Sequence, residues 1–191
     1  MCIRDRPEID PKGSRILLHF EAVATRAVVK VNGKLLGEHL GGWTPFRVDI
    51  TDDYQPDALV EVVVDELPGH NTQGFLPVFI PHFGGIWGKV ELLLVPDTAY
   101  IDDLSLFAAA WETDQARIEL SVKRSVGFTN PLSIGIRAKG SEEWTWNPLS
   151  DTKHSVALKL DESITKEWPI WSPENPTGTD CEFVLRDDST G

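Results

Sequence analysis

The sequence predicts an all-β protein of two consecutive β-sandwiches, and three observations lead to this fold class. Short runs of Val, Ile, Leu and Thr recur about every ten residues and are bounded by Gly, Pro, Asn and Asp, as in strands joined by turns. Helical periodicity is weak throughout. Asn32-Gly33 lies between two β-rich runs, where a type I′ turn needs the positive φ that these residues tolerate best.

Each apolar run between turn residues is expected to form one strand. In the run 27–31, Ala27, Val29 and Val31 alternate with Val28 and Lys30, so the first set should face the core. The same reasoning gives strands at 15–22, 27–31, 34–40, 46–50, 58–64, 89–95, 100–108, 116–125, 132–138, 153–160 and 181–187.

Turn chemistry connects these strands. Gly41-Gly42 permits a tight change of direction, and Pro45 fixes φ before the strand at 46–50. Thr51-Asp52-Asp53 is expected to open a short helical turn by capping its free amides. Pro96-Asp97-Thr98 interrupts the apolar β sequence, so we place a domain boundary there, with domains at 7–98 and 99–191. The second domain, with roughly five strands and polar turns, is consistent with an immunoglobulin-like sandwich.

Composition restricts the partners. The 191 residues are 41% hydrophobic, enough for a folded core, and carry a net charge of -12 that repels nucleic acid and anionic lipid surfaces. No segment approaches the ~18 consecutive apolar residues of a membrane span. Cys2 and Cys181 form no disulfide framework, and the five His residues show no metal-ligand spacing. We therefore expect no nucleic acid, membrane, metal or cofactor, and the cellular location stays unknown.

Three blocks of sequence occur in a characteristic order. The first runs from Asn32-Gly33 to Gly41-Gly42-Trp43-Thr44-Pro45-Phe46, the second is Gly84-Gly85-Ile86-Trp87-Gly88-Lys89-Val90-Glu91-Leu92, and the third is Ile170-Trp171-Ser172-Pro173-Glu174-Asn175-Pro176. In this order and spacing they resemble glycoside hydrolase family 2, the family of β-galactosidases, β-glucuronidases and β-mannosidases. The sequence departs from the family where Gly88-Lys89 replaces the usual Arg-Asp and where Thr177-Gly178-Thr179 follows the third block.

The resemblance implies a jelly-roll-like (galactose-binding-like) sugar-binding sandwich followed by an immunoglobulin-like sandwich, truncated before the catalytic barrel. Such a fragment would hydrolyse nothing alone. In the full-length enzyme it would form one wall of a carbohydrate substrate pocket whose carboxylates lie in the missing C-terminal barrel. Family members carry additional strands before the segment matching Ser14 to Phe20, so we also expect an incomplete first sandwich with an exposed strand edge.

No catalytic residue is assigned. Glycoside hydrolysis usually needs two carboxyl groups, ~5–5.5 Å apart in retaining enzymes. The adjacent acidic pairs are Asp102-Asp103, Glu142-Glu143 and Asp187-Asp188, and neighbours on a strand point to opposite faces. The acid-base Glu of the family follows an Asn, and this sequence contains no Asn-Glu dipeptide.

Three residues are candidates for carbohydrate contact in the complete enzyme: His82, Asp65 and Trp87. His82 lies in a polar, Gly-rich loop and has the side chain to hydrogen-bond a hydroxyl, and Trp87 has the ring to stack on a sugar face. Asp65 ends the strand that leads into this loop. Phe79 occupies the place at which family members carry an acidic residue that reaches the sugar.

Seven Trp residues leave two other functions open. Trp43, Trp87 and Trp171 are expected to pack within the family blocks. Trp144 and Trp146 share one face of an extended segment and either pack in the second core or present a flat aromatic surface. A freestanding carbohydrate-binding module would need such an exposed strip. A structural or adhesive sandwich pair would instead bury Trp43 and the loop that leads to Trp87.

Overall fold

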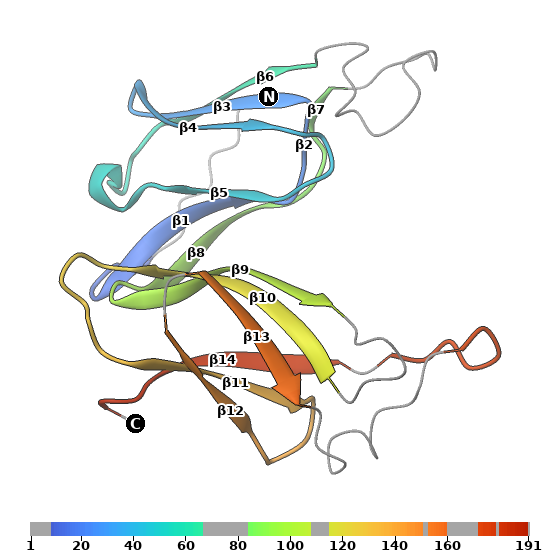
Figure 1. Cartoon of the computed structure of the whole chain (residues 1–191). Helices are drawn as coiled ribbons and strands as arrows, with labels where there is room; N and C mark the ends of the chain where they lie inside the picture. The colour runs from blue at the N-terminus through green and yellow to red at the C-terminus, as the bar shows by residue number, and fades with distance from the viewer. Residues whose placement is uncertain are drawn as a thin grey trace. The chain divides into compact units, whose positions relative to one another are not determined.

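A computed structural model describes residues 9–66, 84–107, 115–150, 153–159, 172–178 and 180–190. The chain divides into two compact units, Met1–Pro96 and Asp97–Gly191. Each unit is built from antiparallel sheets (Figure 1). The predicted fold class is therefore confirmed: a jelly-roll-like β-sandwich is followed by an immunoglobulin-like β-sandwich. The bounds 7–98 and 99–191 of the two domains remain a prediction.

Unit 1 contains two three-stranded sheets and one short ladder. The sheets have the orders β5-β1-β8 and β4-β3-β6, and β2 pairs with β7. The elements are β1 (Ser14–Phe20), β2 (Val23–Ala24), β3 (Arg26–Val31), β4 (Lys34–Leu40), β5 (Phe46–Asp49), the 3₁₀ turn η1 (Thr51–Asp53), β6 (Val60–Asp65), β7 (Gly85–Ile86) and β8 (Val90–Pro96).

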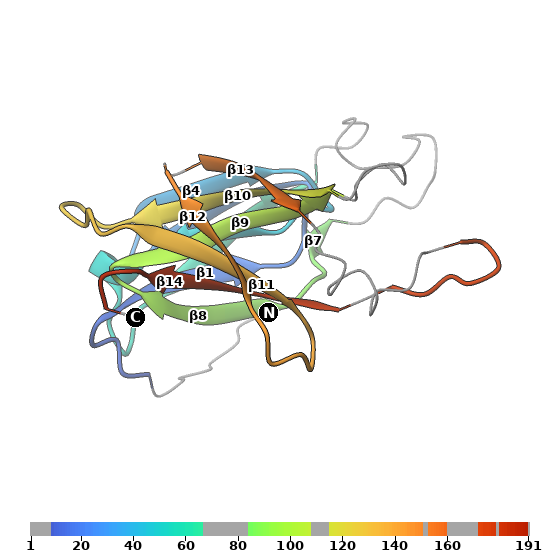
Figure 2. The ribbon, with the colours of Figure 1, turned by 60° about the horizontal axis from the view of Figure 1, so that its bottom comes forward.

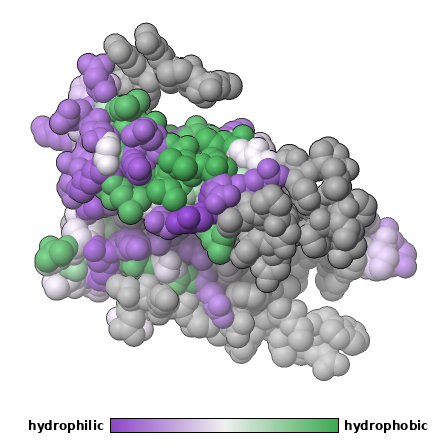
Figure 3. Space-filling model, turned by 90° about the horizontal axis from the view of Figure 1, so that it is seen from above, coloured by the Kyte–Doolittle hydropathy of each residue, from purple (hydrophilic) through white to green (hydrophobic). Residues whose placement is uncertain are grey.

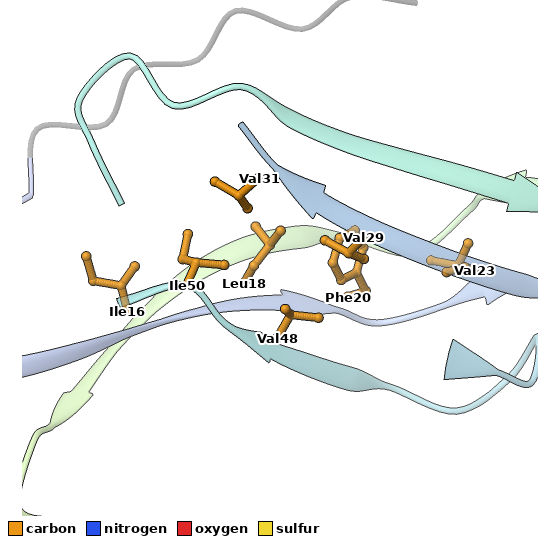
Figure 4. Packing of buried hydrophobic residues seen from close by; sticks show 9 residues of the cluster. Ile16, Leu18, Phe20, Val23, Val29, Val31, Val48 and Ile50 are labelled. Carbon is orange, nitrogen blue, oxygen red and sulfur yellow. The ribbon is translucent and has the colours of Figure 1, made fainter. Parts of the chain in front are cut away.

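Alternate side chains from both sheets of unit 1 form its core (Figure 4). On β3, Ala27, Val29 and Val31 are fully buried, as the alternation predicted. Val29 and Val31 face Leu18 and Phe20 of β1 across the sandwich. Because successive strand residues point to opposite faces, a shift of one residue would expose this whole set. The core also contains Ile16, Val23, Val48 and Ile50.

The predicted two-residue turn is confirmed. Asn32 and Gly33 have φ of 51° and 82°, and they connect β3 directly to β4. The turn is also tied to the start of β6, because Asn32 Oδ1 accepts a hydrogen bond from the amide of Leu59 at 3.0 Å. The register of β3 against both neighbouring strands is thus fixed at this end.

Unit 2 is the second sandwich. Its sheets have the orders β13-β10-β9 and β12-β11-β14, and the strands of each sheet run side by side in Figure 2. Its core includes Leu120, Leu132, Ile134 and Ile136. The strands are β9 (Ala99–Phe107), β10 (Gln115–Arg124), β11 (Leu132–Ala138), β12 (Thr145–Leu149), β13 (Lys153–Lys159) and β14 (Cys181–Asp187).

Three strands of the structure were not predicted from the sequence. β2 and β7 have two residues each, too few for an alternation of side chains to be visible. β12 contains Pro148, which argues against a central strand. In the structure β12 is at the edge of its sheet, where a residue without an N–H group is tolerated.

Unit 1 is open along one side. β4 contacts β5, so the edge strands β6 and β8 lie at the opposite side of the sandwich. Val90 and Leu94 of β8 pair with Phe20 and Ile16, whose side chains face the core, yet they are 45% and 43% exposed. Among the described residues no strand covers these side chains.

The turn η1 forms where it was predicted, but its N-cap residue is Ile50, and no side chain caps it as was expected of Thr51-Asp52-Asp53. Just before the turn, Asp49 Oδ1 accepts hydrogen bonds from the amide of Thr51 at 3.0 Å and from its hydroxyl at 2.6 Å. Burial raises the pKa of Asp49, but these two bonds and the nearby Arg15 outweigh burial and lower it below its ordinary value. Ionised Asp49 therefore stabilises the fold.

We expect Asp49→Asn to lower the free energy of unfolding at neutral pH by about 1 kcal/mol, the usual worth of a partly exposed hydrogen bond. The folded-state pKa is depressed, so the stabilisation is present above the unfolded-state value and is lost as the pH falls through the folded-state value. Urea unfolding at neutral and acidic pH measures this, with Asp52→Asn, an exposed carboxyl of the same turn, as control. A difference from wild type that persists undiminished in acid would contradict it.

Candidate functional site

Three segments that are distant in sequence meet around β2. The amide of Thr25, just after β2, donates to the carbonyl of Asp65 at 3.1 Å, and its own carbonyl accepts from the amide of Gly41 at 2.8 Å. Just before β2, the carbonyl of Ala22 accepts from the amide of Trp87 at 3.3 Å. The ends of β6 and β4 and the start of β8 are therefore held at one end of unit 1, near β2 and β7 in Figure 1.

An exposed pair of Trp side chains lies at this end. The rings of Trp43 and Trp87 pack edge to face, with centroids 4.8 Å apart and an interplanar angle of 69°. The indole N–H of Trp87 donates to the carbonyl of Gly42 at 3.0 Å, which fixes its ring. Trp43 is nonetheless 51% exposed and Trp87 48% exposed. The expectation that both would pack is thus only half right, because they pack on one another and leave aromatic surface accessible.

Glycines allow the backbone segments at this end of unit 1 to approach one another closely. A Cβ atom on Gly88 would lie 2.6 Å from Cβ of Glu21 and 2.7 Å from the amide nitrogen of Ala22, closer than atoms can pack. Gly41 has φ of 143°, a conformation that side chains with a Cβ rarely adopt. The loop that carries Trp43 is further held by His39, which stacks on Phe46 with ring centroids 4.3 Å apart.

The structure describes two of the three predicted carbohydrate contacts. Asp65 is exposed at the end of β6 and Trp87 follows β7, and both are tied through their backbones to the residues that flank β2. His82 lies outside the described residues. Trp43 was not among the predicted contacts; its place in the block Gly41-Gly42-Trp43 was the available signal, but its contact with Trp87 spans 44 positions of sequence.

A second aromatic pair lies in unit 2. Trp144 and Trp146 lie on the face of the sheet opposite to the core, over Gly135, whose absent Cβ makes room for both rings. The guanidinium of Arg137 is 4.4 Å from the ring centroid of Trp144, and that of Arg186 is 3.7 Å from that of Trp146. The pair is therefore neither buried in the core nor a flat exposed strip, because guanidinium groups cover its rings.

Acidic side chains of unit 2 are held in the ionised form. A hydrogen bond from Asn130 lowers the pKa of Asp187, and a hydrogen bond from Ser133 lowers that of Asp188. Neither carboxyl is suited to act as a general acid near neutral pH. Within the described part of the chain, no group of three or more His, Cys, Asp or Glu side chains is placed to hold a metal, and no helix is long and apolar enough to span a membrane.

Comparison with known proteins identifies the relatives of this fold. No family model matches the chain. A β-galactosidase of Thermoanaerobacter pseudethanolicus is 36% identical over 176 residues, which cover 86% of this chain and 23% of the relative. A β-glucuronidase of Bacteroides fragilis is 35% identical over 95 residues, 49% of this chain and 13% of the relative. The structure of a GH2 β-galacturonidase from Eisenbergiella tayi superimposes with a TM-score of 0.67 at 25% identity, over 91% of this chain and 31% of that one.

In sequence and in fold the chain matches the N-terminal β-sandwich domains of glycoside hydrolase family 2 enzymes. The chain spans about a quarter of the length of the Thermoanaerobacter pseudethanolicus β-galactosidase.

We expect Gly88→Ala to lower the free energy of unfolding by about 1–3 kcal/mol, as overpacked substitutions do, because the new methyl group meets the backbone of Ala22. Gly178→Ala is the matched control, since no atom lies within 4 Å of the added Cβ. Urea unfolding of both variants makes the comparison. Equal stability of the two would show that the close approach at Gly88 is not required.

Proposed function

We propose that the chain is the non-catalytic N-terminal part of a glycoside hydrolase family 2 enzyme that hydrolyses O-glycosidic bonds. In this proposal unit 1 supports a catalytic barrel outside this sequence and forms one wall of its carbohydrate pocket. The observation that carries it is the match to a β-galactosidase over 86% of this chain but only 23% of that enzyme.

The surroundings of three described acidic residues support a non-catalytic role for them. General acid catalysis of glycoside hydrolysis needs a carboxyl group whose pKa is raised. The carboxyls of Asp187 and Asp188 are shifted the other way, and Asp102 forms an ion pair with Lys123 at 3.7 Å. These residues therefore fit structural roles better than an acid-base pair.

The end of unit 1 around β2 is the proposed contact with substrate. Trp87 offers an exposed ring that is already oriented by its hydrogen bond to Gly42, which reduces the entropy lost on stacking against a sugar. Trp43 positions that ring through the edge contact. Asp65 and His82 are proposed as hydrogen-bonding groups of the same wall in the complete enzyme.

Two measurements test this proposal. The purified chain should release no chromophore from the p-nitrophenyl β-glycosides of galactose, glucuronic acid or mannose, while a complete family 2 β-galactosidase assayed in parallel cleaves its substrate. The genomic DNA after codon 191 should continue in frame and encode an Asn-Glu dipeptide and a second Glu on barrel strands. Hydrolysis by the purified chain alone, or a stop codon directly after it, would overturn the proposal.

The exposed Trp43–Trp87 pair favours one alternative, a freestanding carbohydrate-binding module. This module would show quenching of Trp fluorescence by galactose, glucuronate or mannose, and Trp87→Ala would abolish the quenching whereas Trp146→Ala would not. We expect no saturable quenching, because two nearly perpendicular rings form no flat platform and the rest of the pocket lies outside this sequence. Saturable quenching that depends on Trp87 would favour the module instead.

A further inference from the structure

The turn Asn32-Gly33 is exposed and chemically reactive. An asparagine that precedes a glycine cyclises readily, because glycine has no side chain to hinder attack by its backbone nitrogen on the carboxamide. Both residues are exposed, and a Cβ atom on Gly33 would meet no described atom within 4 Å. Polar side chains gather at the end of unit 1 where β3 turns into β4, at the left of Figures 1 and 3. Water therefore has access to this turn.

A segment distant in sequence holds Asn32 in place. The amide of Asn32 donates to the carbonyl of Leu59 at 2.9 Å, and Asn32 Oδ1 accepts from the amide of Leu59 at 3.0 Å. This reciprocal pair continues the ladder beyond Val31 and Val60, with a side-chain oxygen in the place of a backbone carbonyl. The two residues are 27 positions apart, so the pair of bonds exists only while β3 and β6 lie side by side.

These bonds keep the carboxamide of Asn32 from the nitrogen that it would react with. In a two-residue hairpin the ladder bonds join the flanking residues, so the amide of Gly33 takes no part in the ladder. Cyclisation requires Cγ of Asn32 to turn toward this nitrogen, whereas the bond from Leu59 holds Oδ1 on the side of β6. The folded unit therefore opposes a reaction that the local sequence favours.

We propose that Asn32 is a site of spontaneous conversion to isoaspartate, which its bonds to Leu59 prevent in the folded chain and their loss permits. The backbone nitrogen of Gly33 bonds to Cγ of Asn32, ammonia leaves with the proton of that nitrogen, and a cyclic succinimide remains. Water then opens the ring at either carbonyl, which gives aspartate or isoaspartate at position 32. Water is the only co-reactant, and no group is oxidised or reduced.

The two products should differ in their effect on the fold. Aspartate keeps an oxygen that can accept from Leu59, and Asp-Gly suits the same type of turn as Asn-Gly. Isoaspartate adds a methylene group to the main chain inside a two-residue turn, which displaces the pairing of Val31 with Lys34. Since the register of β3 decides which of its side chains are buried, isoaspartate alone should destabilise unit 1.

The first test measures the conversion of Asn32 in the purified chain at mildly alkaline pH. Trypsin cuts after Lys30 and Lys34, and chromatography with mass spectrometry then separates the three forms of the peptide 31–34. We expect conversion to be roughly tenfold slower in the folded chain than in urea-unfolded chain, as when a hydrogen bond of ordinary strength must open first. At intermediate urea the rate should rise together with hydrogen exchange of the Leu59 amide. Equal rates in the folded and unfolded chain would overturn the proposal.

The second test uses a matched pair of substitutions at Leu59, whose side chain is 60% exposed. Leu59→Pro removes the N–H group that bonds to Asn32 Oδ1 and should speed conversion in native buffer, whereas Leu59→Ala keeps it and should convert at the wild-type rate. Gly88→Ala, which destabilises unit 1 elsewhere, should also convert at that rate while it stays folded. A folded Leu59→Pro that converts no faster than wild type contradicts the proposal.

Two further measurements need no proline variant. If circular dichroism shows that Leu59→Pro does not fold, the wild-type urea series decides, because conversion that does not follow exchange of the Leu59 amide overturns the proposal. Asn32→Asp should unfold at the urea concentration of wild type, whereas chain that has formed isoaspartate should unfold at a lower one. Equal stability of the isoaspartate form would contradict the assigned effect on the turn. None of these outcomes bears on the glycosidase assignment.

Discussion

Unit 1 depends on the burial of alternate side chains between β1 and β3. Each fully buried Val, Leu, Ile or Phe contributes about 1.5–3 kcal/mol, and Phe20, Val29 and Val31 are all fully buried. The surface ion pair between Arg26 and Glu38, with both side chains almost half exposed, belongs to a class worth ~0–1 kcal/mol. Packing therefore decides the register of β3, and β2, only one residue before β3 in the chain, is carried to its place by the same constraint.

The fold was predictable wherever the local sequence alone determines the backbone conformation. β4, β11 and β14 have the bounds that alternation gave, and Asn32-Gly33 forms the turn that its backbone preferences require. Failures occurred where a longer-range contact decides. The first residue of η1, Thr51, is bonded to Asp49, which lies before the turn and is itself paired with Arg15 of the neighbouring strand β1. Propensity alone does not reveal this acceptor.

The candidate site was predictable only in part for the same reason. Asp65 and Trp87 were chosen because they flank a polar loop, and both are bonded to the backbone that flanks β2. That β2 exists at all could not be seen, since it has two residues and its partner β7 follows 61 positions later. The partnership of Trp43 with Trp87 depends on this hidden ladder, so no local pattern predicts it.

The two Trp pairs show how surroundings decide what an aromatic ring can do. In unit 2, Gly135 lets Trp144 and Trp146 lie across the sheet, and the guanidinium groups of Arg137 and Arg186 then cover their rings. Arg137 is also held by Glu182 at 2.6 Å, so a ligand would have to break a charge-assisted bond to reach the ring that Arg137 covers.

In unit 1 the same residue type is exposed. The indole N–H of Trp87 is satisfied by a backbone carbonyl, and no cation covers its exposed ring among the described contacts. This ring can therefore be reached without breaking an ion pair, unlike the ring that Arg137 covers. From sequence only Trp144 and Trp146 were paired, because the residues that pack around each ring are brought together from different strands. The accessible aromatic surface around Trp87 is therefore the reason that unit 1, and not unit 2, is proposed to contact substrate.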